Sequence, residues 1–201
     1  SATCHHMRVS DTKKKPLHSS TQEAGPLMLQ AFAWDMAPDA SHWRYLAQHA
    51  QAIADLGVTI IWLPPAYKGN FGLDDVGYGV YDLYDLGEFD QKGTIPTKYG
   101  TKDEYLAAID ALHEARIAVC ADIVLNHRMG ADATETVRAT PINPQDRHQA
   151  LGDPETIEAW TRFTFPGRGG AYSDFTWDWT CFHGIDWDQA TQRKGLWLFE
   201  G

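Results

Sequence analysis

The sequence contains few cysteines, and their number and spacing argue against a disulfide-stabilised fold. Only Cys4, Cys120 and Cys181 occur in 201 residues. An odd and widely spaced set is a poor disulfide framework and favours a reducing compartment. Cys4-His5-His6 could capture a metal ion adventitiously, but no second pair of ligands follows nearby in the sequence. We therefore interpret this stretch as part of a tail.

Long apolar runs and an excess of positive charge are also absent. No apolar stretch reaches the roughly 20 residues that a bilayer-spanning helix requires. Lys and Arg together number 17, against 27 for Asp and Glu, which gives a net charge of −10. This charge disfavours nucleic acids and anionic membranes as partners. An acidic surface instead suits a neutral or cationic ligand.

The N-terminal segment lacks a secretory signal. Residues 1–26 are polar, contain Lys13-Lys14-Lys15 and have no apolar middle. We therefore expect a flexible leader over 1–26 and a cytoplasmic protein, or a secreted one whose signal has been removed. Walker, Gly-x-Gly-x-x-Gly, Gly-x-Ser-x-Gly and His-Glu-x-x-His motifs are missing as well. The common signatures of nucleotide binding, serine hydrolysis and zinc proteolysis are therefore not found.

From residue 27 onward, the sequence alternates apolar strands with amphipathic helices. Strands are predicted over 27–32, 58–63 and 117–125. One helix follows Ser41, a good N-cap, and another follows Thr101, which can form a capping box with Glu104. Apolar residues recur at helical spacing in both: Trp43, Leu46, Ala50, Ile53 and Ala54, then Tyr105, Leu106, Ile109 and Leu112. This order predicts an α/β fold with a parallel sheet covered on both faces.

The pattern changes after the third predicted strand. Residues 130–149 are polar, and Asp153-Pro154 predicts a short helix that extends through Trp160. Residues 172–199 are dense in aromatic side chains, which predicts a small, irregular, β-rich subdomain. We therefore expect a part over 27–127 built on the parallel sheet and an inserted domain over 128–201.

The segment 66–100 is too long for a plain connection between two elements. Its central stretch, Asp75-Val-Gly-Tyr-Gly-Val-Tyr-Asp-Leu-Tyr-Asp-Leu86, contains three tyrosines and three aspartates. Aromatic faces stack on the C–H faces of sugar rings, and carboxylates accept hydrogen bonds from sugar hydroxyls. The alternative is a packed surface loop whose tyrosines bury their rings. Trp34, just after the first strand, would point to the same face of a parallel sheet.

Three polar residues lie in or after the third strand: Asp122, Asn126 and His127. Parallel α/β sheets and barrels build their sites at the carboxyl ends of strands. Asp122 is surrounded by apolar residues and needs partners, whether it ties down a loop or serves a function. Asn126 either offers a carbonyl oxygen to Ca²⁺ or caps a turn. His127 either donates a hydrogen bond to a ligand hydroxyl or is structural.

Asp122-Ile-Val-Leu-Asn126-His127 resembles the first signature region of the α-amylase family of glycoside hydrolases. The likeness, which points to liquefying bacterial and cytoplasmic forms, continues in Gln30-Ala-Phe-Ala-Trp34, Trp62-Leu-Pro-Pro-Ala-Tyr-Lys-Gly69, the stretch from Asp75 to Phe89, Lys98-Tyr-Gly-Thr101 and Phe165-Pro-Gly-Arg-Gly169. The resemblance implies a (β/α)₈ TIM barrel with a β-rich domain B inserted after strand three. Residues 27–127 would then hold the first three βα units, and 128–201 an incomplete domain B.

The resemblance also implies a function and roles for the site residues. The family hydrolyses internal α-1,4 bonds of starch, glycogen or maltooligosaccharides with retention at the anomeric carbon. Tyr78 would stack on the sugar at the cleavage subsite, His127 would hydrogen-bond that sugar, and Asp122 would organise the site. Trp34 would lie near the glycone side, and Asn126 would be a Ca²⁺ ligand.

Two departures from the family pattern limit this implication. No Phe-Arg-x-Asp motif occurs, so we expect the nucleophile, the acid and the third carboxylate beyond Gly201. A retaining glycosidase needs two carboxyl groups about 5 Å apart. His183 stands where secreted members often have a metal-binding aspartate, and histidine is a poor Ca²⁺ ligand. We therefore expect the N-terminal part of an α-amylase, inactive by itself. The alternatives are a non-catalytic α-glucan-binding fragment and a truncated gene product without a function of its own.

Overall fold

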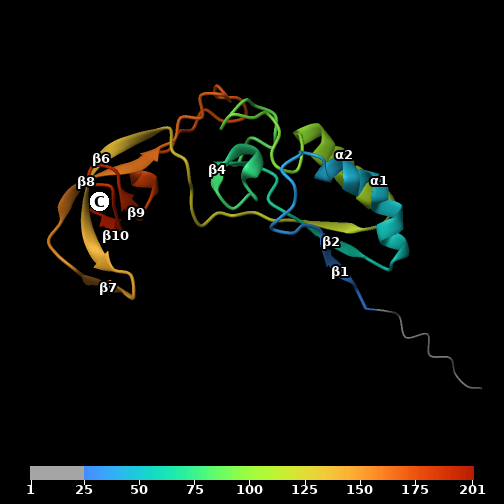
Figure 1. The fold of residues 1–201 in the computed structure, drawn as a ribbon, viewed down its shortest axis with the longest axis horizontal. Helices are drawn as coiled ribbons and strands as arrows, with labels where there is room; N and C mark the ends of the chain where they lie inside the picture. The colour runs from blue at the N-terminus through green and yellow to red at the C-terminus, as the bar shows by residue number, and fades with distance from the viewer. Residues whose placement is uncertain (1–24) are drawn as a thin grey trace, which may run out of the picture.

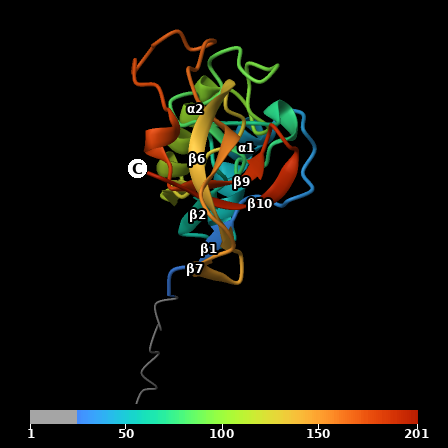
Figure 2. The ribbon, with the colours of Figure 1, turned by 90° about the vertical axis from the view of Figure 1, so that its left-hand side faces the viewer.

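The computed structural model describes residues 25–201, which contain two main sheets of different kinds (Figure 1). A parallel sheet with two helices lies at one end of the molecule and an antiparallel sheet at the other, with the segment around β4 between them. Viewed from the left-hand side of Figure 1, the antiparallel strands face the viewer (Figure 2). Most of the predicted leader 1–26, including Cys4-His5-His6, lies outside the described residues.

The parallel sheet has the strand order β1-β2-β5. Its strands are β1 (Met28–Gln30), β2 (Ile60–Leu63) and β5 (Ala118–Ala121). Helix α1 (His42–Asp55) lies between β1 and β2, and helix α2 (Lys102–Glu114) precedes β5. This is the predicted order of strands and helices. Within the described residues, the three parallel strands form an open sheet and not a closed barrel.

Local sequence signals mark the starts of both helices and the end of α1. Helix α2 begins with the predicted capping box, in which Thr101 and Glu104 each accept a hydrogen bond from the other's backbone N–H. Helix α1 begins after Ser41 as predicted, but the Ser41 hydroxyl donates to Asp39 and does not cap the helix. Gly57 has a φ of +88°, which lets the chain leave the helical path after α1.

Helices α1 and α2 pack against each other and against one face of the parallel sheet. Their shared core consists mainly of Trp43, Leu46, Ala50, Ile53, Ile61, Leu63, Tyr105, Ala108 and Leu112. Leu106 was expected on the buried face of α2 but is 46% exposed. It lies about 100° around the helix from Tyr105, so the buried stripe continues through Ala108 instead.

The expectation that the parallel sheet is covered on both faces is wrong for the described residues. Ile61 and Leu63 are fully buried against the helices. On the opposite face, Trp62 is partly exposed and its neighbour Cys120 is exposed. Apolar strands are compatible with either arrangement, because side chains that point into a barrel are also apolar.

The third parallel strand is shorter than predicted, since β5 stops before Asp122 and does not reach Leu125. The Asp122 N–H still donates to the last carbonyl of β2, at 3.3 Å. The neighbouring chain then enters Pro64-Pro65, which has no N–H groups to continue the ladder. Asp122 is therefore in an irregular segment and not in a buried strand, and Leu125 in that segment is 74% exposed.

The chain after β5 forms a five-stranded antiparallel sheet. Its strands are β6 (Ala133–Asn143), β7 (Asp146–Ala150), β8 (Glu155–Arg162), β9 (Gly184–Asp188) and β10 (Arg193–Phe199). The order is β7-β6-β10-β9, and β8 pairs with β6. The strands enclose a second core of Val137, Ala139, Ile157, Ala159 and Trp197. This part is β-rich as expected, but it already begins with β6, whose polar composition does not indicate a strand.

The helix predicted from Asp153 through Trp160 is wrong, because this segment forms β8. Ile157 and Ala159 are buried, whereas Thr156 and Trp160 are exposed, which is the period-two pattern of a strand. Short apolar runs are compatible with either element when considered alone. Antiparallel pairing along β6 selects the strand.

Four short elements complete the fold: β3 (Lys68–Gly69), η1 (Gly72–Asp74), β4 (Val80–Asp82) and η2 (Trp179–Cys181). Strands β3 and β4 pair with each other in the long segment between β2 and α2. No helix in residues 25–201 is both long enough and apolar enough to cross a membrane.

His42, the first residue of α1, is expected to make the stability of the fold depend on pH. It is 8% exposed, and its Nε2 is buried without a hydrogen-bond partner in the described part of the chain. Burial lowers the pKa of His42. The unfolded chain therefore binds the proton more readily, so stability should decrease as the pH falls below about 6.5 and continue to decrease until the lowered pKa is reached.

Urea denaturation at about pH 7.5 and about pH 5.5 measures this effect. We expect the free energy of unfolding to decrease more over this interval in the native sequence than in a His42→Leu variant. Equal decreases in the two proteins would contradict the role of His42.

Candidate functional site

Four of the five predicted site residues meet at the carboxyl end of the parallel strands. Trp34 follows β1, Asp122 and His127 follow β5, and Tyr78 comes from the segment between β2 and α2. One stacking contact and two hydrogen bonds join these four residues. They are referred to below as the Tyr78 cluster.

Asp122 is the acceptor at the centre of the Tyr78 cluster. Its Oδ2 accepts hydrogen bonds from the Tyr78 hydroxyl at 2.8 Å and from the Trp62 indole N–H at 3.2 Å. Burial, together with the Asp122 carboxylate, raises the pKa of Tyr78 to about 12. The phenol is therefore neutral near pH 7 and remains a hydrogen-bond donor to Asp122.

Trp34 and Tyr78 form a stacked pair. Their ring centroids are 5.8 Å apart, and their planes differ by 7°. Trp34 is 69% exposed, so the face of its indole that is turned away from Tyr78 is open to solvent. A flat, exposed aromatic face of this kind can stack on the C–H face of a sugar ring.

His127 holds the backbone of Tyr78 in place. Its Nε2 lies 2.7 Å from the Tyr78 carbonyl oxygen. Because a carbonyl only accepts, Nε2 of the neutral ring carries the hydrogen and Nδ1 is the acceptor. Asn126 Nδ2 lies 3.4 Å from that Nδ1 and is therefore placed to donate to it. The Asn126 side-chain oxygen remains available at the exposed rim of the cluster.

Asn126 is the one predicted calcium ligand, and it offers a single side-chain oxygen. Ca²⁺ requires about six to eight oxygen ligands, and Asn126 supplies one. Residues 25–201 contain no group of three or more His, Cys, Asp or Glu side chains that could hold a metal ion. The described residues therefore do not form a complete calcium site.

The segment 66–100 is mostly a packed structure, as one of the two interpretations predicts. Asp75, Asp82 and Asp85 are buried and accept hydrogen bonds from backbone N–H groups of their own segment. Tyr81 is also buried. Among the three central tyrosines, Tyr78 and Tyr84 keep exposed surface, and Tyr78 is the one in the cluster. The aspartates thus shape the segment and leave Tyr78 at the surface.

A buried lysine organises the same segment from within. Lys68 is completely buried, and its Nζ donates to the carbonyl oxygens of Phe89, Thr94 and Ile95 at 3.0, 2.6 and 2.6 Å. The Asp85 carboxylate lies 3.5 Å from the same Nζ. Burial lowers the pKa of Lys68, and the charge of Asp85 opposes this shift.

Two polar contacts, one buried and one partly buried, attach this segment to the chain after β5. Arg168 Nε donates to Asp82 Oδ2 at 2.8 Å, and the Tyr81 hydroxyl donates to Asp132 at 2.7 Å. Tyr81 also packs on Phe165 in a third small core. These contacts attach the chain segments on either side of the β6–β8 pair to the segment 66–100.

Two residues that support the cluster, Trp62 and Tyr67, were not predicted as site residues from the sequence. Trp62 donates to Asp122, and Tyr67 accepts a hydrogen bond from the Val124 N–H at 2.8 Å. Burial raises the pKa of Tyr67 to about 12. The strand alternation would have indicated Trp62, because its neighbours Ile61 and Leu63 face the helices and Trp62 must face the opposite way.

A family model and individual relatives both match this chain and point to the same family. A family model described as "Alpha amylase, catalytic domain" matches residues 31–179. The alpha-amylase of Geobacillus stearothermophilus is 51% identical over 174 residues, which cover 87% of this chain and 32% of that protein. The cytoplasmic alpha-amylase of Escherichia coli (strain K12) is 50% identical over 171 residues, which cover 85% of this chain and 34% of that protein. The chain thus spans about a third of the length of these relatives.

Solved structures show a similar arrangement of the chain. The truncated alternansucrase of Leuconostoc mesenteroides superposes with a TM-score of 0.60 and 30% sequence identity, covering 69% of this chain and 13% of that one. A second alternansucrase structure with the same TM-score was solved in complex with isomaltotriose.

Proposed function

Because the chain belongs to the α-amylase family of glycoside hydrolases, we propose that it forms the N-terminal part of an enzyme that cleaves internal α-1,4 bonds of starch or glycogen. Residues 27–127 would provide the first three βα units of a (β/α)₈ barrel. Residues 128–201 would provide most of a domain B inserted after the third strand. The parallel order β1-β2-β5 and the antiparallel sheet that follows support this division.

The Tyr78 cluster is the observation that carries the proposal. Trp34 offers an exposed indole face, and Tyr78 is oriented by Asp122 and by His127 from two sides. A sugar hydroxyl could donate to His127 Nδ1 by replacing the long contact from Asn126. We propose that these residues bind and orient one sugar ring of an α-glucan. The cluster would contribute by binding the sugar and holding it in a fixed orientation. Such positioning supplies a large part of the rate enhancement of many enzymes.

The same cluster lacks the groups that would cleave the glycosidic bond. In residues 25–201, Asp122 is the one carboxylate that hydrogen-bonds to a member of the cluster. Asp75, in the same segment as Tyr78, already accepts three backbone N–H groups. A retaining glycosidase needs a nucleophile and an acid about 5 Å apart. We therefore propose that the chain holds the sugar and that further parts of a longer protein supply the nucleophile and the acid.

The preformed cluster also favours a second function for the chain by itself, namely non-catalytic binding of α-glucans. The Asp122, Tyr78 and His127 contacts are made within the described chain and need no further residues. Binding of maltooligosaccharides without hydrolysis would support this second function over a gene product without function.

The isolated 201-residue chain is expected to show no hydrolysis of soluble starch. Its cluster contains one carboxylate where retention of configuration requires two. Release of reducing ends, measured with rigorously purified protein, checks this expectation. The cytoplasmic alpha-amylase of Escherichia coli, assayed in parallel, is a suitable positive control. Turnover that co-purifies with the chain and is lost in an Asp122→Ala variant would contradict the expectation.

A Trp34→Ala variant is expected to bind maltooligosaccharides about tenfold more weakly, the equivalent of roughly 1.4 kcal/mol. Trp34 is 69% exposed, so its removal takes away the stacking surface without opening a cavity in the core. A matched control is Tyr45→Ala, which removes a 56% exposed aromatic residue from α1. Calorimetric titration measures both affinities, and equal affinities would count against the cluster as the binding site.

We also propose a cytoplasmic location and a calcium ion at Asn126 for the longer protein. The similarity to a cytoplasmic alpha-amylase supports the location, and the exposed Asn126 amide oxygen supports the ion. Cell fractionation tests the first proposal. The dependence of thermal stability on added calcium, compared with an Asn126→Ala variant, tests the second.

A further inference from the structure

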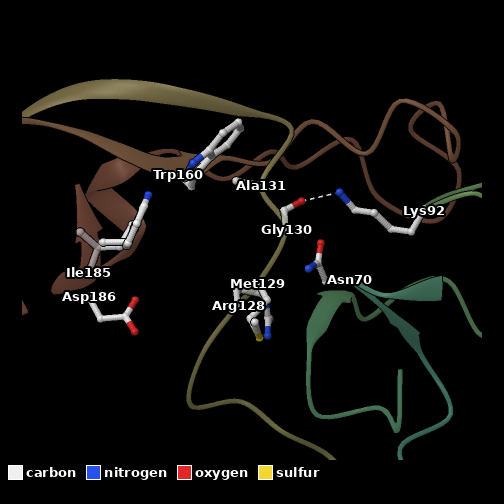
Figure 3. Close-up of a pocket in the computed structure, with 10 residues that line it drawn as sticks. Asn70, Lys92, Arg128, Met129, Gly130, Ala131, Trp160, Ile185 and Asp186 are labelled. Carbon is white, nitrogen blue, oxygen red and sulfur yellow. Dashed lines mark hydrogen bonds between the residues drawn. The ribbon is translucent and has the colours of Figure 1, made fainter. Parts of the chain in front are cut away.

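Pockets lie near both ends of the long strand β6. One, of about 450 Å³, lies between the segment that follows β5 and the β8–β9 part of the sheet, with Lys92 on the side away from Trp160 (Figure 3). The other, of about 610 Å³, lies among the end of β6, the β7–β8 connection and the start of β10. It is called the β10 pocket below. Its volume falls within the roughly 300–1,000 Å³ that is usual for small-molecule sites, and no member of the Tyr78 cluster lines it.

The β10 pocket exists because β10 separates from both of its neighbours along part of its length. In the described chain, β10 pairs with β6 at residues 197–199 and not earlier. Its register with β9 shifts between Lys194 and Trp197, so that Gly195 and Leu196 together face Asp186. A β-bulge of this kind leaves the extra residue unpaired. Backbone groups of β10 that lack a ladder partner therefore border the pocket.

The interior of the β10 pocket is mainly apolar and contains a fixed tryptophan. Trp197 is 2% exposed, and its indole N–H donates to Glu155 at 2.8 Å. Arg193 pairs with the same Glu155 oxygen and lies 5.1 Å from the centre of the Trp197 ring. The charges of Arg193 and Glu155 thus compensate each other. Ile142 and Leu151 add aliphatic surface to the wall, which suits a ligand with aliphatic side chains.

Two further charges of opposite sign line the β10 pocket. Asp153 lies in the β7–β8 connection, and Lys194 lies in β10. Both are exposed, and neither forms an ion pair with another residue of 25–201. A purely anionic ligand would meet Asp153 in a chain of net charge −10, and a purely cationic ligand would meet Lys194. The pocket therefore favours a ligand that has an apolar body and one charge of each sign.

We propose that the β10 pocket binds a short apolar peptide with free termini, such as a dipeptide of aliphatic residues. Lys194 pairs with the peptide carboxylate, Asp153 pairs with the ammonium group, and the unpaired backbone of the bulge forms hydrogen bonds with the peptide group. The aliphatic side chains of the ligand pack on Ile142 and Leu151. Capture of chain termini and addition to a free strand edge are both recurrent modes of peptide recognition.

An NMR titration of the 201-residue chain with the dipeptide Leu-Leu tests the proposal. The Trp197 indole N–H signal reports on the pocket, because this group donates to Glu155 in the pocket wall. We expect Lys194→Gln and Asp153→Asn each to weaken binding about fivefold, and Lys194→Arg to retain it. Asp103→Asn is the matched control, because it removes the charge of an exposed carboxylate in α2 and should leave the affinity unchanged.

Leu-Leu with one end blocked assigns each charge to its partner. The C-terminal amide has no carboxylate, so its affinity should be about fivefold lower and should not change in Lys194→Gln. The N-acetylated dipeptide has no ammonium group, so its affinity should not change in Asp153→Asn. These pairs of changes form double-mutant cycles between ligand and protein.

Three results would overturn the proposal. The first is a Trp197 signal that Leu-Leu does not shift, and the second is equal affinity for Leu-Leu in the native sequence and in both variants. The third is binding of the two blocked dipeptides as tightly as Leu-Leu itself. The proposed function would stand in each case, because no member of the Tyr78 cluster takes part and the Trp34→Ala titration tests that cluster separately.

Discussion

Replacement of Lys68 with methionine is expected to lower the free energy of unfolding by about 3–5 kcal/mol, because it removes one partner of a buried ion pair. The Lys68 ammonium group is fully buried and serves three carbonyl oxygens in addition to Asp85. Methionine fills a similar volume but donates nothing. The carbonyls of Phe89, Thr94 and Ile95 would lose this donor, and a buried unsatisfied group costs about 1–3 kcal/mol.

The matched control is the same substitution at an exposed lysine. Lys102 Nζ lies 2.9 Å from Glu88, with both side chains partly open to solvent. Exposed ion pairs contribute about 0–1 kcal/mol, so Lys102→Met should have a small effect. Urea denaturation monitored by tryptophan fluorescence measures both variants. Similar losses in the two variants would show that Lys68 does not hold the segment 66–100 together.

Replacement of Arg168 with methionine is the second change with a large expected effect, again about 3–5 kcal/mol. The side chains of Arg168 and Asp82 are each about 1% exposed, and Arg168 Nε lies 2.8 Å from Asp82 Oδ2. The guanidinium also donates to the Ala171 and Ser173 carbonyls and lies 4.9 Å from the Phe165 ring. Methionine would leave the Asp82 charge buried with fewer partners and would free the turn that follows Phe165.

Besides lowering the free energy of unfolding, Arg168→Met should loosen the chain locally around residue 168. Arg168 is 86 residues away from Asp82 in the sequence, so the pair joins the segment 66–100 to the chain after β8. We expect faster amide hydrogen exchange and protease cleavage near residues 168–175 in the variant. Arg138→Met is the matched control, because Arg138 pairs with Glu200 at an exposed position. Unchanged exchange in the 168–175 turn would contradict the proposed attachment.

The elements that the sequence predicts correctly are those defined by neighbouring residues. The Thr101–Glu104 capping box and the buried stripe of α1 depend on contacts three or four residues apart. The wrong helix at 153–160 shows the limit of such reasoning. That segment contains apolar residues at spacings compatible with either element, and its pairing partner, β6, begins some 20 residues earlier in the chain.

At the candidate site too, the sequence predicts the residue types but not their long-range contacts. The sequence points to Trp34, Tyr78, Asp122 and His127 as residue types suited to bind a sugar, but it leaves open whether the aspartates of segment 66–100 face the ligand. Those aspartates have donors in their own segment and are buried. Which carboxylate meets Tyr78 depends on a hydrogen bond across 44 residues.

By itself, the sequence determined the order of the parallel strands and their helices, the starts of both helices, the candidate residues of the Tyr78 cluster and the resemblance to the α-amylase family. These features follow from local periodicity, capping and short motifs, all of which depend on residues that are close together in the sequence. The tertiary structure alone decided that one face of the parallel sheet is open, that residues 155–162 form a strand, and that Lys68 and Arg168 are buried. It also decided that a pocket lined by Trp160 and Trp187, among other residues, forms beside the antiparallel sheet. These features depend on contacts between residues far apart in the chain, whose free energy is gained only when the whole fold brings them together.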